Sequence, residues 1–142
     1  MKFLAFILLL IALVFEVSLT TLPLIFLVLL TLTVVIKEYW IFLFAFIFGV
    51  LLDLISFKTI GISSAYFITF IFLVLLYQKK FEISTIYFVF TSSFLGSFGF
   101  LLILGYNNSI LLQAFVSSLI GVFIFLGFKR FIRLDSNSSK NL

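Results

Sequence analysis

Cysteine and histidine are both absent from this 142-residue chain, and it contains only one proline. Without cysteine the chain can form no disulfide framework, no thiol nucleophile and no thiolate metal site. Without histidine it lacks the commonest general base and the commonest metal ligand. These two absences exclude the disulfide scaffolds, the thiol enzymes and the proteins that bind metals through Cys and His.

Charged residues are also scarce, at 10% of the chain, whereas 65% of the residues are hydrophobic and the mean hydropathy is +1.44. A soluble domain is about 25% charged and about 45–50% apolar, so this chain has too little polar surface to cover a globule in water. Intrinsic disorder is excluded as well, because it requires low hydrophobicity and high charge. The composition therefore predicts an all-α integral membrane protein whose surroundings are bilayer lipid.

Apolar segments separated by charges and turn formers predict six transmembrane helices, because about 20 residues cross the hydrocarbon core. Their predicted ranges are 3–19, 24–36, 41–57, 62–77, 83–104 and 110–128. The first two are short for a crossing and are divided at residues 20–23 by a tight turn, in which Pro23 opens the second helix. Residues 1–134 are predicted to form a single transmembrane domain, and residues 135–142 a polar, disordered cytoplasmic tail.

The basic residues are distributed unevenly over the two sides of this six-helix arrangement. Only Lys58 falls on the side opposite the termini, and the other eight of the nine basic residues share the side of both termini. These eight are Lys2, Lys37, Lys79, Lys80, Lys129, Arg130, Arg133 and Lys140. The positive-inside rule then predicts that both termini are cytoplasmic. The net charge of +4 is therefore attributed to membrane orientation, and no nucleic-acid partner is predicted.

Two acidic residues, Glu16 and Asp53, lie inside predicted spans, where an ionisable group is expensive and requires an explanation. For Asp53 two interpretations stay open. It either caps a helix or forms a salt bridge near the outer interface, with Lys58 as a candidate partner, or it contacts an ion, a substrate or a partner protein. Glu16 is a possible intramembrane polar group of the same kind, or it simply reaches the headgroup region because its helix is short.

Small residues recur at helical spacing beside these acids and in the last two predicted helices. The stripes are Ala5, Ala12 and Thr20 with Glu16; Ala45, Gly49 and Ser56 with Asp53; Thr85, Ser92, Gly96 and Gly99; and Ala114, Ser118 and Gly121. Small residues at such spacings let helix backbones approach closely within a membrane. Packing inside the bundle is the favoured interpretation for the last two helices, and a docking face for another membrane protein is the alternative.

Residues 48–65 contain the run Gly49-x-x-x-Asp53-Leu-Ile-Ser56-x-x-Thr59-x-Gly61, followed by Ser64 and Ala65. This run resembles the signature of the MreD family, the bacterial rod shape-determining membrane proteins. The resemblance extends more loosely over most of the chain, through its length, its hydropathy and the proline that opens the second helix. It implies that Gly49, Asp53, Ser56, Thr59 and Gly61 are motif and interaction residues, with no catalytic residue, metal ligand or cofactor.

The resemblance further implies a non-enzymatic component of the cell-wall elongation machinery in the bacterial inner membrane. Its expected partners are MreC-type proteins, the RodA and transpeptidase pair and, indirectly, the MreB cytoskeleton. The family is also similar in fold to the substrate-binding S-components of energy-coupling-factor transporters. A vitamin-type binding subunit is therefore the alternative, with outer ligands drawn from Glu16, Asp53, Lys58, Tyr106, Asn107 and Asn108. A membrane-embedded enzyme is least favoured, because the acids lie one per helix without a recognisable catalytic motif.

Overall fold

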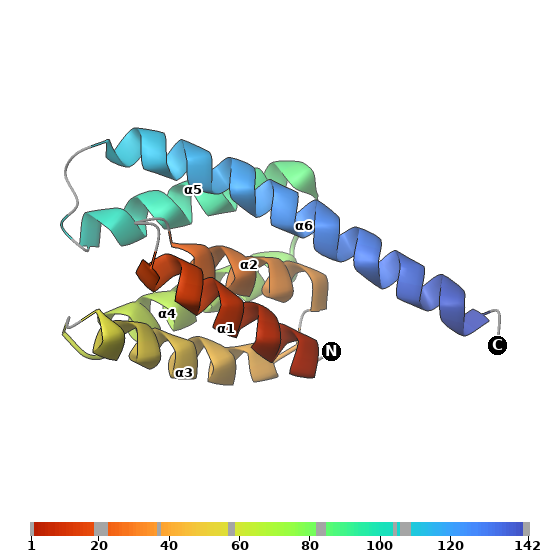
Figure 1. Cartoon of the computed structure of the whole chain (residues 1–142). Coiled ribbons are helices and arrows are strands. Elements are labelled where there is room, and N and C mark those ends of the chain that lie inside the picture. Colours follow the sequence, from red (N-terminus) through yellow and green to blue (C-terminus); the bar gives the residue numbers. More distant parts are fainter. Residues whose placement is uncertain are drawn as a thin grey trace.

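A computed structural model of the chain describes residues 2–18, 23–36, 38–56, 59–81, 85–103, 105 and 109–140. Within these residues every regular element is an α-helix, which confirms the all-α prediction for the described part of the chain. The helices are α1 (Lys2–Ser18), α2 (Leu24–Ile36), α3 (Trp40–Ile55), α4 (Ile62–Gln78), α5 (Ile86–Ile103) and α6 (Ile110–Lys140) (Figure 1). The bounds of α2 agree with the predicted range at both ends. Residues 20–22 of the turn predicted at 20–23, and the predicted start of the fifth helix at residue 83, lie outside the described residues.

The last helix differs from its prediction. Instead of ending at Phe128, with a polar segment after it and a disordered tail from residue 135, α6 continues as an exposed helix to Lys140 and projects beyond the other helices (Figure 1). Extending an existing helix costs little per residue, since the unfavourable step is nucleation. Along this extension the hydroxyl of Ser136 donates to the carbonyl of Arg133, and that of Ser139 donates to the carbonyl of Ser136. The polar residues therefore continue the helix instead of ending it.

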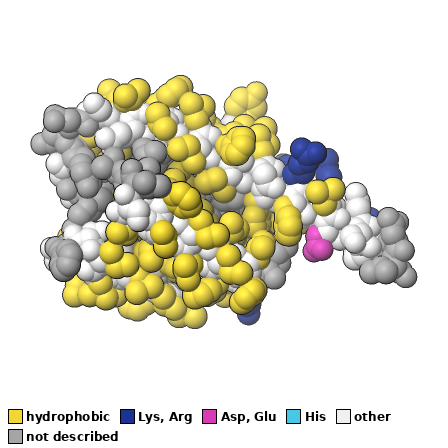
Figure 2. Space-filling model, viewed as in Figure 1, with side chains coloured by type: hydrophobic (Ala, Val, Ile, Leu, Met, Phe, Trp, Pro, Cys, Tyr) yellow, Lys and Arg dark blue, Asp and Glu magenta, His cyan; other side chains and the backbone are white. Residues whose placement is uncertain are grey.

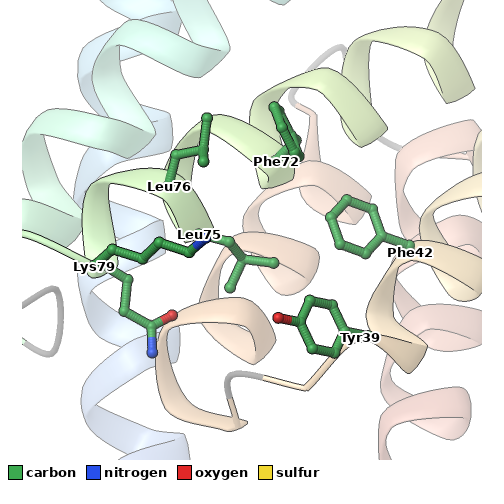
Figure 3. Close-up of a pocket in the computed structure, with 7 residues that line it drawn as sticks. Tyr39, Phe42, Phe72, Leu75, Leu76 and Lys79 are labelled. Carbon is green, nitrogen blue, oxygen red and sulfur yellow. The ribbon is translucent and has the colours of Figure 1, made fainter.

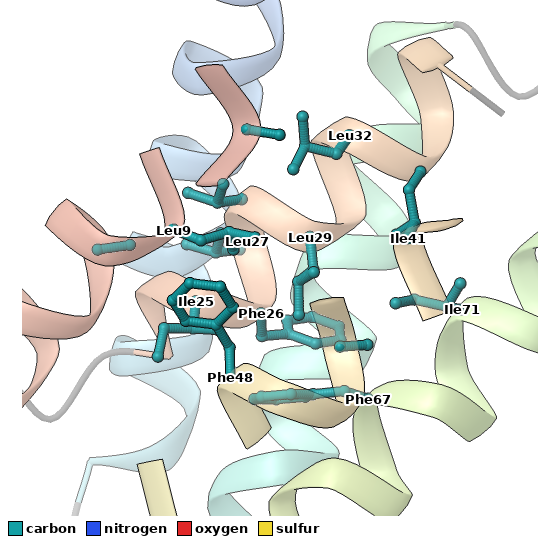
Figure 4. Close-up of a cluster of buried hydrophobic side chains, with 14 of the residues drawn as sticks. Leu9, Ile25, Phe26, Leu27, Leu29, Leu32, Ile41, Phe48, Phe67 and Ile71 are labelled. Atoms are coloured by element: carbon teal, nitrogen blue, oxygen red, sulfur yellow. The ribbon is translucent and has the colours of Figure 1, made fainter. Parts of the chain in front are cut away.

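Helix α2 is the centre of the bundle and packs against each of the other five helices. Ten of its thirteen residues are buried, as expected for a helix that is hydrophobic on every side. Its buried threonines, Thr31 and Thr33, donate to the carbonyls four residues earlier, so their hydroxyls stay paired in apolar surroundings. Figure 4 shows its side chains among those of α1, α3 and α4, represented by Leu9, Phe48 and Phe67.

The outer surface of the bundle is largely apolar, and Figure 2 shows hydrophobic side chains over most of the visible face. Large side chains such as Phe3, Phe123 and Leu111 are 77%, 80% and 66% exposed. The largest apolar patch on a soluble monomer is typically only about 300–600 Å². Helices α5 and α6 are long and apolar enough to cross a membrane, whereas α2, α3 and α4 are apolar but shorter. The surface and these two helices indicate that the protein associates with a membrane.

Successive helices alternate in direction, which gives the bundle two distinct ends (Figure 1). We call the end where α1, α3 and α5 finish the turn end, and the opposite end, which holds both chain termini, the terminal end. The acidic residues Glu16 and Asp53 belong to the last turns of α1 and α3, so both lie toward the turn end.

Candidate interaction site at the turn between α3 and α4

Asp53 is buried, with 1% of its surface exposed, and it caps the helix that follows its own. Its Oδ2 accepts hydrogen bonds from the backbone N–H groups of Gly61, at 2.9 Å, and of Ser63, at 3.2 Å. Its Oδ1 accepts a 2.6 Å bond from the hydroxyl of Ser63. The N-cap residue of α4 is Gly61, which has no side chain to satisfy the first N–H groups of the helix. The carboxylate from α3 supplies that cap, and its negative charge faces the positive end of the α4 dipole.

Gly49 lies one helical turn before Asp53 and makes this cap geometrically possible. A Cβ atom added at Gly49 would lie 2.7 Å from the backbone nitrogen of Ser64 and closer still to its Cα. Only glycine fits there without moving backbone, so α3 and the first turn of α4 meet almost backbone to backbone. The four-residue spacing puts Gly49 and Asp53 on the same face of α3. Gly49 lets the two helices come close, and Asp53 can then reach the first N–H groups of α4.

Gly61 is required for its backbone conformation and not for lack of space. Its φ is +101°, a value that side-chain-bearing residues rarely adopt, and a Cβ there would meet no atom within 4 Å. The Gly61 carbonyl accepts from the N–H of Ala65, at 2.9 Å, and from the hydroxyl of Ser64, at 3.1 Å. The chain thus reverses at Gly61 and enters α4 with its first backbone groups already paired.

The other two motif residues lie beside this cluster. Ser56 is the C-cap of α3, and its N–H donates to the carbonyl of Leu52 at 2.9 Å. Thr59 is exposed in the connection between the helices, and Lys58, the candidate ion-pair partner, lies outside the described residues. The structure therefore supports the capping interpretation of Asp53. Sequence reasoning missed Ser63, for which the only available signal was a pair of serines opening an otherwise apolar helix.

Glu16 repeats the arrangement in the preceding hairpin. Its Oε2 accepts a 2.9 Å hydrogen bond from the N–H of Ile25 in the first turn of α2. The residue before that helix is Pro23, which offers no side-chain acceptor, and its carbonyl accepts from the N–H of Leu27. In both α1–α2 and α3–α4, a carboxylate in the last turn of one helix thus accepts from the start of the next: Glu16 from one backbone N–H and Asp53 from two. Glu16 is therefore engaged inside the bundle, which supports its interpretation as a polar group of the helix packing.

The small residues of α5 and α6 pack inside the chain. Gly96 receives the ring of Phe26 from α2, and its carbonyl accepts a 2.7 Å hydrogen bond from the hydroxyl of Tyr66 on α4. A Cβ at Gly121 of α6 would lie 2.5 Å from the hydroxyl oxygen of Ser93 on α5. These contacts support bundle packing as the role of both stripes.

The interface between α5 and α6 also contains polar atoms that the stripes did not include. The buried oxygens of Ser93, Ser97, Ser117 and Gln113 have no hydrogen-bond partner among the described residues. Gly121 of α6 lies opposite Ser93 of the antiparallel helix α5. One helical turn further along the pair, Ser97 of α5 and Ser117 of α6 therefore lie at the same height. The stripes predicted from the sequence contain Ser92 and Ser118, which are the chain neighbours of Ser93 and Ser117, and so they miss these buried serines.

The described contacts of Asp53 are structural, because they cap α4. Both carboxylates that the transporter alternative counts as ligands are bound to backbone N–H groups, and Tyr106, Asn107 and Asn108 lie outside the described residues. No group of three or more His, Cys, Asp or Glu side chains that could hold a metal ion occurs among the residues described. The scan against known protein families, the search of curated proteins and the search of solved structures each give no match for this chain.

Proposed function

We propose that this chain is a non-enzymatic, multi-pass membrane protein of the bacterial cell-wall elongation machinery, similar to the MreD family. It acts by presenting a rigid helical surface to other membrane proteins. The observation that carries the proposal is the α3–α4 hairpin, where Gly49, Asp53 and Gly61 of the MreD-like run join in one capped, closely packed turn.

The energetics of this turn fit a protein that works through its shape. A carboxylate costs roughly 2.5–3.5 kcal/mol at the bilayer centre on insertion scales, and less toward the interface. Three hydrogen bonds to the Asp53 carboxylate offset that cost and fix α4 relative to α3. A turn held in this way keeps the neighbouring exposed side chains in a constant arrangement.

The partner surface that we propose is the exposed apolar flank of this hairpin. It comprises Leu51, Leu54, Ile55 and Ile60, which are 38%, 50%, 41% and 63% exposed. Apolar side chains held on a rigid backbone are typical of contact surfaces, because little conformational freedom remains to be lost on binding. MreC-type and RodA/transpeptidase-type membrane proteins are the proposed partners.

The proposed setting is the bacterial inner membrane, with six crossings and both termini in the cytoplasm. The alternating helix directions and the apolar surface support it (Figures 1 and 2). So does the sequence, in which eight of nine basic residues fall on the side of the termini. The short α2 is compatible with this arrangement because the other helices surround it.

The test is a double variant of the proposed flank, Leu54→Ala with Ile60→Ala, compared with Phe123→Ala. Phe123 is 80% exposed on α6 and lies outside the flank, so its truncation removes a similar apolar surface from another face. In a strain depleted of its MreD-type protein, we expect the wild-type chain and Phe123→Ala to restore rod shape and to co-purify with an MreC-type partner. The double variant should lose both properties while keeping its thermal unfolding midpoint. Failure of the wild-type chain to restore shape, or full activity of the double variant, would contradict the proposal.

A further inference from the structure

An open groove of about 320 Å³ lies at the terminal end of the bundle, between the start of α3 and the end of α4 (Figure 3). Phe42 of α3 and Phe72, Leu75 and Leu76 of α4 form its apolar walls. Its volume is at the lower limit of known ligand pockets, which span about 300–1,000 Å³. The groove is separate from the α3–α4 turn, which is at the opposite end of both helices.

The polar side chains of the groove come from both helix ends and carry a single charge. They come from Tyr39, Gln78 and Lys79, so the described lining includes one cation and no acidic side chain. In Figure 3 the Lys79 side chain extends to Leu75, and the Tyr39 hydroxyl points from the opposite side of the groove toward the end of α4 that holds Lys79. The groove is therefore amphiphilic, with apolar walls, a positive charge and two neutral polar side chains.

The apolar walls face outward from the bundle. Phe72 is 53% exposed and Leu76 is 43% exposed, although both belong to the apolar length of α4. In a bilayer these surfaces meet lipid chains, while lysine and tyrosine at a helix end lie at the headgroup level. An occupant that matches both parts has an apolar chain and a negatively charged head.

We propose that this groove binds one anionic phospholipid, with an acyl chain against Phe72 and Leu76 and the phosphate at Lys79. The hydroxyl of Tyr39 and the amide of Gln78 are available as further donors to the headgroup. The terminal end is the cytoplasmic end in the proposed topology, and the cytoplasmic leaflet is the anionic one. The inference rests on the proposed membrane setting, but not on the assignment of protein partners.

Two adjacent pairs of residues provide matched controls for this site. Lys79 lines the groove, whereas the neighbouring Lys80 is exposed and does not line it. Phe72 lines the groove, whereas Leu73, which is 55% exposed, does not. Lys79→Gln and Lys80→Gln remove the same charge, and Phe72→Ala and Leu73→Ala remove similar exposed apolar surface.

The experiment measures lipid binding by native mass spectrometry of the purified full chain, released from phosphatidylcholine nanodiscs that contain increasing fractions of phosphatidylglycerol. The wild-type chain should retain one phosphatidylglycerol in preference to phosphatidylcholine. Lys79→Gln should weaken that binding about fivefold, the factor expected for one lysine at an anionic surface. Phe72→Ala should weaken the binding of both lipids. The two control variants should bind phosphatidylglycerol as the wild-type chain does.

Equal losses in Lys79→Gln and Lys80→Gln would show general surface attraction and overturn the groove assignment. Wild-type binding without preference for phosphatidylglycerol, or retention of a peptide in the place of lipid, would also overturn it. In these cases the proposed function would stand, because the chain would still have entered the bilayer. A purified chain that does not incorporate into nanodiscs at all would instead contradict the membrane setting on which both proposals depend.

Discussion

At the scale of single residues, the roles of Gly49 and Asp53 depend on each other. A carboxylate on α3 reaches the first N–H groups of α4 only if the two backbones are nearly in contact, and Gly49 permits that contact. The close contact of the two backbones in turn allows Asp53 to accept from the first N–H groups of α4, which Gly61 has no side chain to cap. The MreD-like run therefore describes one physical unit, in which a glycine and an aspartate share a face of one helix and a glycine begins the next.

Gly49→Ala should destabilise the protein, by about 1–3 kcal/mol, because the added methyl group meets the Ser64 backbone and not a flexible side chain. The matched control is Gly127→Ala in α6, where a Cβ would meet no atom within 4 Å. That change should be neutral or stabilising by up to about 1 kcal/mol, since alanine is the better helix former. Thermal unfolding in detergent measures both. Equal effects of the two substitutions would contradict the close approach at Gly49.

Asp53→Asn should be tolerated better than Asp53→Leu. Asparagine keeps an acceptor for the N–H groups of Gly61 and Ser63, and loses mainly the charge at the α4 N-terminus, worth about 0.3–2 kcal/mol. Leucine leaves buried donors unpaired, at about 1–3 kcal/mol for each such group. Asp135→Leu provides the control, because Asp135 is exposed on α6 and its replacement should change stability by less than about 0.5 kcal/mol. An Asp53→Leu protein that unfolds like the wild type would refute the capping role.

At the scale of elements, two of the three hairpins share one device and the third uses another. In α1–α2 and α3–α4 a carboxylate from the first helix caps the second. In α5–α6 the described device is the close approach of small residues, with Gly121 facing Ser93, which α3–α4 combines with its cap through Gly49. The first two hairpins each begin their second helix at a residue without a capping side chain, Pro23 or Gly61, which explains why the acid must come from the neighbouring helix.

The sequence predicted most of these elements because each is a continuous apolar segment, and α2 in particular is bounded by strong local signals. It could not decide between capping and ligand binding for Asp53, since the deciding contacts join residues eight and ten positions apart across a turn. It also missed Ser63 and the serines of the α5–α6 interface, because the facing side of an evenly apolar helix has no periodic signal. The extension of α6 was missed because polar composition was interpreted as an end of structure.

Truncation should separate the packed part of α6 from its extension. Phe125 is 1% exposed and Phe128 is 7% exposed, and Ile132 packs against the core cluster that contains Phe128, whereas residues 135–140 are all exposed. A chain that stops after Leu134 should unfold within about 0.5 kcal/mol of the full chain, as expected when only exposed residues are lost. A shorter chain that stops after Ile124 loses both phenylalanines, at about 3–5 kcal/mol for each buried ring removed. Equal unfolding midpoints of the two truncated chains would contradict this division.

At the scale of the whole molecule, the two ends of the bundle differ in charge. The terminal end carries Lys2, the Lys79–Lys80 pair and the basic residues of α6, which together outnumber the acids Glu38 and Asp135 there. Three of the α6 cations line a second groove of about 500 Å³.

The turn end carries the other two described acids, both bound to helix N-termini within the bundle. In Figure 2 the visible basic side chains lie near the base of the α6 extension and at the lower edge of the bundle, away from the turn end. In the proposed membrane setting, this polarity predicts a fixed orientation with the basic end in the cytoplasm.

Reporter fusions test that orientation directly. Alkaline phosphatase is active only outside the cytoplasm, so a fusion after Asn108, between α5 and α6, should be active and one after Lys80, between α4 and α5, should be inactive. A fluorescent protein that matures only in the cytoplasm should give the reverse result at the same two positions, which controls for differences in expression. The physical reason is the basic asymmetry, since moving Lys79 and Lys80 across the bilayer would oppose both the membrane potential and the attraction of the anionic leaflet. Phosphatase activity at both positions would mean that α5 does not cross the membrane, and the opposite pattern would invert the topology.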